Sequence, residues 1–160
     1  MSSASTLTIG KRIIIIPARM ASHRFPGKPM AEIKPGVPLV RAVYDRAKLT
    51  VADHVIVATP DREVAQYCKD NGMVWRPTRP DHPTGTHRCA EVVRQFKEDV
   101  EVSTVVNWQC DEPMVPVDVV NKLLTSEPTI VTLIGEGEGD LNNDPNVVKV
   151  VVSHPSARCH

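Results

Sequence analysis

Short runs of β-branched and other apolar residues recur along this chain, and segments of a different period separate them. Five of these runs predict strands, at 13–16, 55–58, 104–107, 129–134 and 147–152. The runs are nearly continuous rather than alternating, which is typical of strands that are covered on both faces. Apolar residues at helical spacing predict helices at 38–49, 62–70, 84–96 and 117–124. Strands that alternate with helices predict βαβ units, and therefore an α/β fold with a mostly parallel sheet.

The two ends of the chain differ from its middle. Residues 1–10 are small and polar, and we expect a flexible tail there, ahead of one domain that spans 11–160. The tail lacks a long apolar stretch, so no signal peptide is expected, and every apolar run is too short to cross a bilayer. A glycine-rich acidic loop is expected at 135–146. A turn-like segment follows the run at 147–152, which is typical either of a natural terminus or of a fold cut short.

Composition narrows the class of protein. The chain has 160 residues, of which 41% are hydrophobic, and 19 basic residues balance 19 acidic ones. This is the composition of a globular domain, and the absence of net charge argues against a general nucleic-acid or membrane binder. Any anion site therefore has to be local. The four cysteines are widely spaced, so neither a zinc site nor a disulfide framework is expected, and reduced thiols fit a cytoplasmic location.

The loop after the first strand run is unusually cationic. Ligands of open α/β sheets bind beyond the carboxyl ends of the strands, where this loop lies. Phosphate groups are held at such places by backbone N–H groups, by a glycine that allows close approach and by fixed cations. The loop offers residues of these kinds in Arg19, Ser22, Arg24, Gly27 and Lys28. A solvated basic surface loop is the alternative, but the position and density of the charges favour an anion site.

Two familiar phosphate loops are excluded by the spacing. A Rossmann fingerprint requires GxGxxG, and the loop contains only Gly27. A Walker loop requires GxxxxGK followed by Ser or Thr, but Ser22 stands in place of the first glycine and Pro29 in place of the Ser or Thr. The loop is therefore expected to act without a helix N-terminus directly behind Lys28. Pro26 and Pro29 would stiffen it instead, and so reduce the entropy lost when the cations are held in place.

A second polar cluster follows the run at 104–107. Residues 105–116 read VVNWQCDEPMVP, so an apolar strand leads into polar side chains and then into a proline. Asp111 is expected at the carboxyl end of a central strand, facing the same edge as the cationic loop. Magnesium prefers carboxylate oxygens with water and substrate phosphates, so Asp111 is a candidate ligand, and the combination indicates a nucleoside triphosphate. The alternative is that Asp111 and Glu112 cap the following turn.

A third stretch, RPDHPTGTHRCAEVV at 79–93, places small polar residues at the start of a predicted helix, namely Thr84, Gly85 and Thr86. They can cap the helix, present hydrogen-bonding groups to a base, or do both. Asp61 is a plausible N-cap of the helix predicted at 62–70. We interpret His82 and His87 as surface histidines and not as metal ligands.

Together these stretches resemble the 3-deoxy-D-manno-octulosonate (Kdo) cytidylyltransferases, also called CMP-Kdo synthetases. The PARxxSxRxPGKP loop of that family is present here as PARMASHRFPGKP, and its VIVATDD strand as VIVATPD. Its DHxSGT, QGDEPxIP and NPNAVKVV segments are present as DHPTGT, QCDEPMVP and DPNVVKVV. The match runs in order from residue 12 to about residue 152, and its first motif separates this family from the sialic-acid cytidylyltransferases.

The resemblance implies a Rossmann-like nucleotidyltransferase fold of the GT-A-like kind, a three-layer α/β sandwich. It also implies a reaction, in which the anomeric hydroxyl of Kdo attacks the α-phosphorus of CTP. The products are pyrophosphate and CMP-Kdo, the activated sugar for lipopolysaccharide biosynthesis. The implied cofactor is Mg²⁺, the implied assembly is a homodimer, and no nucleic-acid or membrane partner is expected.

Matched positions assign roles to individual residues. The residues expected to hold the triphosphate are Arg19, Ser22, Arg24 and Lys28. Lys28 would neutralise charge that develops on the leaving pyrophosphate, Asp111 would bind magnesium, and both are expected to be catalytic together with Arg19. Gln109 is expected between nucleotide and sugar. The residues expected near cytosine and ribose are Thr84, Gly85 and Thr86.

The chain departs from the family pattern at several positions. Cys110 replaces a glycine beside the metal carboxylate, so a side chain occupies a place of close backbone approach. Thr84 replaces a serine, Pro60 an aspartate and His87 an acidic residue. The chain corresponds to the N-terminal two-thirds of the family fold, and the remainder would carry a second magnesium aspartate and much of the sugar pocket. Two alternatives therefore stay open, a CTP-binding remnant without activity and one half of a two-chain enzyme.

Overall fold

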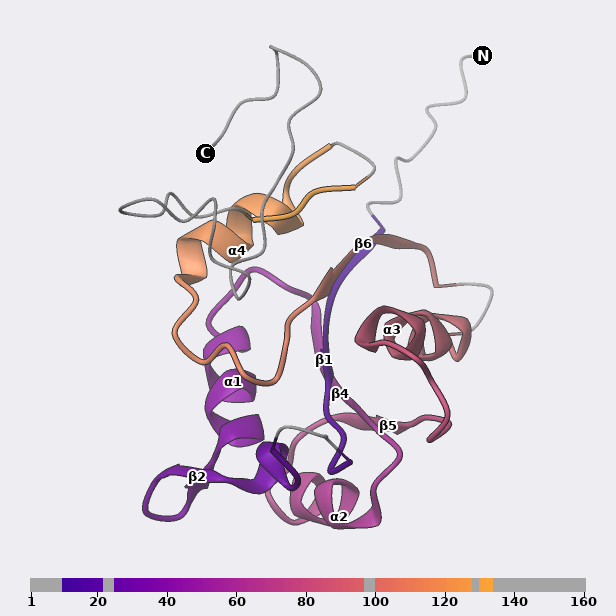
Figure 1. Ribbon diagram of the computed structural model, residues 1–160. Coiled ribbons are helices and arrows are strands. Elements are labelled where there is room, and N and C mark those ends of the chain that lie inside the picture. The colour runs from indigo at the N-terminus through magenta and orange to yellow at the C-terminus, as the bar shows by residue number, and fades with distance from the viewer. Residues whose placement is uncertain (1–9, 22–24, 97–99, 128–129, 134–160) are drawn as a thin grey trace, which may run out of the picture. The chain divides into compact units, whose positions relative to one another are not determined.

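The computed structural model describes residues 10–21, 25–96, 100–127 and 130–133 (Figure 1). The chain divides into two compact units, Met1–Ser126 and Glu127–His160, and every described helix and strand belongs to the first unit. In the described part of the chain, no helix is both long enough and apolar enough to cross a membrane.

A parallel sheet forms the centre of the first unit. Strand β1 (Lys11–Pro17) lies between β4 (His54–Thr59) and β6 (Val102–Asn107), and β5 (Trp75–Pro77) pairs with the outer side of β4. All three pairings are parallel. The strand runs at 13–16, 55–58 and 104–107 are thus confirmed as strands, as is the mostly parallel sheet.

Helices cover both faces of this sheet. In Figure 1, α3 lies on one side of it, and α1 and α2 lie on the other side. The four helical segments that the apolar periodicity predicts are confirmed. The helices are α1 (Leu39–Ala47), α2 (Arg62–Asp70), α3 (Gly85–Arg94) and α4 (Val117–Leu124).

The four isoleucines of β1 fill two hydrophobic cores. Ile13 and Ile15 are fully buried in the cluster that includes residues of α3. Ile14 and Ile16 are fully buried in the opposite cluster, to which α1, α2 and α4 contribute. Because successive side chains of a strand point to opposite faces, an uninterrupted apolar run is what a strand between two helical layers requires. The α/β sandwich expected from the sequence is confirmed.

Several short elements escape the sequence pattern. A 3₁₀ helix, η1 (Lys28–Met30), follows the loop after β1, and β2 (Glu32–Lys34) pairs antiparallel with β3 (Val37–Pro38). Together with β5, these elements have two or three residues each, which is too short for a period to show.

The strand predicted at 129–134 is wrong over its described part. Residues 130–133 belong to no strand, and Ile130 is 90% exposed. An apolar, β-branched run forms a strand only where a partner edge supplies the ladder and a packed face, so propensity alone does not decide. The strand predicted at 147–152 and the loop predicted at 135–146 lie outside the described residues.

The register of the sheet brings three loops to one edge. Pro17 is paired with Ala58, and Ile15 is paired with Asn107. The chain therefore leaves β1, β4 and β6 at the same carboxyl edge, where parallel α/β sheets bind their ligands.

Candidate functional site

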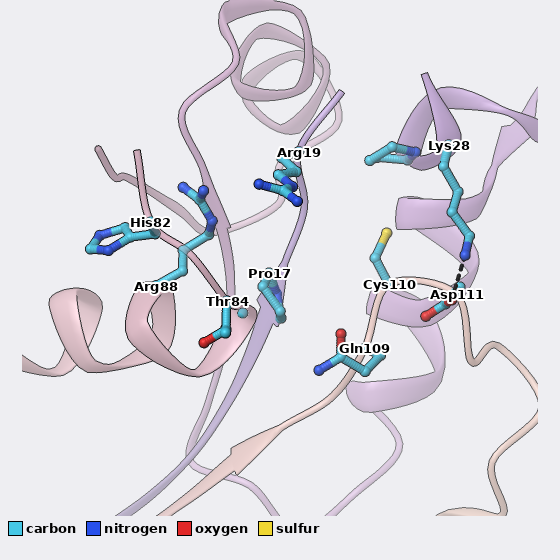
Figure 2. A pocket seen from close by; sticks show the side chains of 11 residues that line it. Pro17, Arg19, Lys28, His82, Thr84, Arg88, Gln109, Cys110 and Asp111 are labelled. Carbon is cyan, nitrogen blue, oxygen red and sulfur yellow. Dashed lines mark hydrogen bonds and ion pairs between the residues drawn. The ribbon is translucent and has the colours of Figure 1, made fainter. Parts of the chain in front are cut away.

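A pocket of about 220 Å³ opens at the carboxyl edge of the sheet (Figure 2). Four segments line it: the end of β1 with the residues after it, the 3₁₀ helix η1, the first turn of α3 with the stretch that leads into it, and the turn after β6. These segments are far apart in sequence, and the parallel register is what gathers them. Its expected site residues are Arg19, Lys28, Thr84, Gly85, Gln109 and Asp111.

The loop after β1 is fastened at both ends. At its start, Ala18 donates its backbone N–H to Ala58 O at 2.9 Å, and Met20 donates to the carboxylate Oδ2 of Asp61 at 2.7 Å. Further on, Gly27 donates to Met20 O at 2.9 Å. Arg19, which is exposed, is thereby held between two anchored neighbours.

Asp61 has a different role from the predicted one. It occupies the N-cap position of α2, but its side chain makes no capping hydrogen bond to that helix. The carboxylate instead accepts the hydrogen bond from Met20 N, so the end of β4 holds the loop that carries Arg19. A carboxylate at this position can accept a hydrogen bond either from the backbone N–H groups of the helix or from those of a neighbouring loop. Here it accepts one from the loop after β1.

The expectation that no helix begins at Lys28 is wrong in detail. Gly27 adopts a left-handed backbone conformation, with φ of 76°, and the single turn of η1 starts directly after it. The physical reason is that this glycine reverses the chain and Pro29, with its fixed φ, continues into the turn. Pro29 is buried and helps to hold Lys28 at the pocket.

Lys28 and Asp111 form an ion pair across the pocket, although 83 residues separate them. Figure 2 shows the two side chains pointing toward one another. Their side chains are 34% and 45% exposed, and ion pairs this accessible contribute only about 0–1 kcal/mol. Lys28, which was predicted to bind phosphate, and Asp111, which was predicted to bind magnesium, therefore lie in contact. Because their ion pair is weak, each can exchange the other for a ligand.

Hydrogen bonds close the turn that presents Asp111. Trp108 is buried, its backbone N–H donates to Ile15 O at 3.0 Å, and its indole N–H donates to Glu112 O at 2.9 Å. Glu112 N in turn donates to Gln109 O at 3.2 Å. Backbone groups thus close this turn. Burial, and then the charge of Asp111, raise the pKa of the Glu112 carboxyl.

Cys110, which stands where the family pattern has glycine, is accommodated in the pocket wall. Its side chain is 7% exposed and belongs to the same core cluster as Trp108. Burial raises the pKa of its thiol to about 12, so the group is a neutral, apolar part of the wall at neutral pH.

The start of α3 approaches β1 closely at Gly85. A Cβ placed there would lie 3.1 Å from Cγ of Pro17 and 3.6 Å from Nε2 of Gln109. Thr84 is the N-cap, and its Oγ1 accepts a hydrogen bond from His87 N at 3.3 Å, so the predicted cap is confirmed.

Two other polar groups extend the site toward β6. Gln109 donates to Oδ1 of Asn107 at 3.1 Å, and Asn107 donates to Oγ1 of Thr86 at 3.4 Å. Gln109 lines the pocket. Thr86 does not line it, and is linked to Gln109 only through the side-chain amide of Asn107. Ser22 and Arg24, the remaining expected triphosphate contacts, lie outside the described residues.

The sequence interpretation of His82 as a surface histidine is wrong. Its side chain is only 15% exposed, it lines the pocket, and its Nε2 is hydrogen bonded to Oε2 of Glu91. The same carboxylate accepts the backbone N–H of Arg79 at 2.9 Å. These bonds, with the His82 bond first, lower the pKa of Glu91. His87 is exposed, as expected.

Sequence reasoning also missed Arg88. Its side chain lines the pocket although the residue is only 2% exposed, and its Nη1 donates to Oγ1 of Thr78 and, at 2.9 Å, to Arg79 O. Helical periodicity assigns charged residues to the solvent face, so the pattern offered no signal for this burial.

Comparisons with known proteins agree with this geometry. The sequence model of the cytidylyltransferase family matches residues 13–155. The 3-deoxy-manno-octulosonate cytidylyltransferases of Polynucleobacter asymbioticus and Halorhodospira halophila are 41% and 43% identical, each over 88% of this chain. A solved CMP:2-keto-3-deoxy-manno-octonic acid synthetase, in complex with CTP, is 40% identical over 72% of this chain and 46% of its own, with a TM-score of 0.64.

The chain spans 57% and 56% of the length of those two curated relatives. The match nevertheless includes every segment that lines the pocket. The resemblance that the motifs indicated is therefore confirmed, and this chain belongs to the cytidylyltransferase family.

Proposed function

We propose that this chain carries the CTP-binding part of an enzyme that transfers CMP from CTP to the anomeric hydroxyl of Kdo. The observation that carries the proposal is the meeting of Lys28 and Asp111 at a pocket that Arg19 also lines. Two cations and an exposed carboxylate at the carboxyl edge of a parallel sheet suit a triphosphate with its metal. The names of the relatives, and the CTP bound to the similar solved structure, support the choice of substrates.

In this proposal the residues divide the work of binding. Arg19 and Lys28 bind phosphate oxygens, and Lys28 neutralises charge on the departing pyrophosphate. The hydroxyl oxygen of Kdo forms a bond to the α-phosphorus, the bond from that phosphorus to the bridging oxygen breaks so that pyrophosphate leaves, and the hydroxyl proton passes to solvent water. Gln109 offers an amide at the pocket wall, where it can orient the incoming sugar. Thr84 and Gly85 present small groups to the nucleoside.

Magnesium is part of the proposal. Asp111 presents a carboxylate that is 45% exposed, and an oxygen donor of this kind fits the preference of the ion. The described residues include no group of three His, Cys, Asp or Glu side chains that could bind a metal, so substrate phosphates and water would complete the coordination. When bound, the ion would supply charge neutralisation on the triphosphate.

The proposal also places the protein in the cytoplasm, as a homodimer.

A second candidate function is CTP binding without transfer. It is favoured by the pocket lining, in which Gln109, expected between nucleotide and sugar, is the single residue among the described ones that the sequence placed next to the sugar at all. The remaining expected residues serve the nucleotide or the metal.

The deciding experiment is an assay of pyrophosphate release with CTP, Mg²⁺ and Kdo, each omitted in turn. Release that requires all three supports cytidylyl transfer. Absence of release, with CTP binding retained in a calorimetric titration, supports the second candidate. Absence of both release and CTP binding would overturn the proposed function.

A further inference from the structure

Arg88 is a buried cation in the wall of the pocket. The residue is 2% exposed, and only one nitrogen of its guanidinium, Nη1, has a hydrogen-bond partner among the described residues. That nitrogen donates to Oγ1 of Thr78 and to Arg79 O. The N–H groups on Nε and Nη2 remain available. In the described part of the chain, every side-chain nitrogen or oxygen that is fully inaccessible has a hydrogen-bond partner, so these two unpaired nitrogens are not fully inaccessible. The available donors therefore keep some accessible surface, on a residue that lines the pocket.

The charge of Arg88 has no carboxylate partner within ion-pair distance in the described residues. Asp61 and Glu91 act on it electrostatically, but each is engaged elsewhere. The Asp61 carboxylate accepts the N–H of Met20, and the Glu91 carboxylate binds His82 and the N–H of Arg79. Buried charges in proteins are normally paired, so an unpaired one in a pocket wall indicates a missing ligand.

Arg19 makes the imbalance larger. It lines the same pocket, and Figure 2 shows the two guanidinium groups on the same side of it, across from Lys28 and Asp111. Burial, followed by the charge of Arg19, lowers the pKa of Arg88, which means that the two cations repel each other. Two guanidinium groups that face one space form a fork for an anionic group with several oxygens.

We propose that Arg88 is a further ligand-binding residue, and that it and Arg19 together hold one phosphate group of the nucleotide. The hydrogen bonds to Thr78 and Arg79 O fix the guanidinium so that its other donors face the pocket. The inference deepens the proposed function and rests on it. It assigns a second phosphate contact to the wall opposite Lys28, so the triphosphate is gripped from two sides.

The test is a calorimetric titration of the full chain with inorganic tripolyphosphate and, separately, with cytidine. Arg88→Gln should weaken tripolyphosphate binding by about 30-fold or more, because truncating one member of a buried charge pair has effects of this size. Cytidine affinity should change by less than about twofold, since the removed contact is to phosphate. Arg88→Lys, which keeps the charge, should lose less affinity than Arg88→Gln.

Two controls separate binding from folding. Arg94→Gln removes an exposed arginine from the same helix and should leave both affinities unchanged. Thr78→Val removes a hydrogen-bond partner of Arg88 and keeps the charge, so it reports the effect of the structural bond alone.

Three outcomes would overturn the inference. The first is unchanged tripolyphosphate affinity in Arg88→Gln. The second is an equal loss for cytidine and tripolyphosphate, which would mark a structural residue or a contact to the base. The third is the same loss in Thr78→Val as in Arg88→Gln. If the unmodified chain binds neither CTP nor tripolyphosphate, the proposed function itself fails, which distinguishes that failure from the other three.

Discussion

The two walls of the pocket handle charge in opposite ways. On one wall, Lys28 and Asp111 are partly exposed and satisfy each other. On the other wall, Arg88 is buried, and backbone and hydroxyl oxygens hold it instead of a carboxylate. The first wall can exchange partners at little cost, because water already screens the pair. The second wall is fixed before any ligand arrives, and preorganised donors of this kind act without rearrangement.

The largest expected effect comes from removing the cation of the exposed wall. Lys28→Ala should weaken binding of CTP with magnesium by about 30-fold or more, because a phosphate group would lose a charged hydrogen-bond donor. Calorimetric titration measures the change. Lys122→Ala, an exposed lysine on α4, is the matched control and should stay within about twofold. Equal effects of the two substitutions would contradict the assignment of Lys28 to phosphate.

A change at Gly85 should disturb the junction between the two walls. Gly85→Ala places a Cβ at 3.1 Å from the ring of Pro17, which the strand β1 holds in place. We expect a loss of about 1 kcal/mol in the free energy of unfolding, typical of mild overpacking, together with weaker CTP binding. Urea denaturation followed by tryptophan fluorescence measures the first effect. Arg94→Ala, an exposed position on the same helix, is the control, and a Gly85→Ala variant with unchanged stability and unchanged CTP affinity would contradict the expected disturbance.

The exposed pair should matter for the ligand and hardly at all for the fold. Asp111→Asn is expected to change the free energy of unfolding by less than about 1 kcal/mol, because the pair is accessible to solvent. The same variant should weaken the dependence of CTP affinity on magnesium concentration, because the ion would keep only phosphate oxygens and water as ligands. A titration at several magnesium concentrations tests this, and a magnesium dependence equal to that of the unmodified chain would show that Asp111 is not a ligand.

The smallest effect concerns acid stability on the buried wall. The pKa of Glu91 is lowered by its hydrogen bonds to His82 and Arg79 N. The folded pKa lies below the unfolded one, so the stabilisation is fully present above the unfolded value, near 4.5, and is lost as pH falls through the folded pKa. Glu91→Gln should therefore flatten the dependence of the melting temperature on pH below about pH 5. A slope equal to that of the unmodified protein would count against this pairing.

The strands and helices around the core were predictable because each follows from local chemistry. Ile13 to Ile16 form a run that can be buried on both faces only inside a two-sided sheet. The helices at 62–70 and 117–124 even begin and end at the expected residues. The run at 129–134 shows the limit of this reasoning, because a strand also needs a partner that the run itself does not specify.

The site was only half predictable, for a physical reason. Lys28 and Asp111 were found from motifs, and the meeting of the two follows from a parallel register. Arg88 and His82 were missed because burial of a polar side chain depends on partners distant in sequence. Those partners are Thr78 and Glu91, and the periodicity of the sequence does not predict either contact.

The depth at which the thiols are buried has a consequence for their reactivity. Burial raises the pKa of Cys68 to about 11, and the pKa values of Cys89 and Cys110 to about 12. At neutral pH these thiols are therefore almost wholly protonated, and the thiolate is the form that alkylating reagents attack. These three cysteines would become reactive mainly when the surrounding packing opens. Their alkylation rate would thus report the rate of local unfolding in both hydrophobic clusters and in the pocket wall.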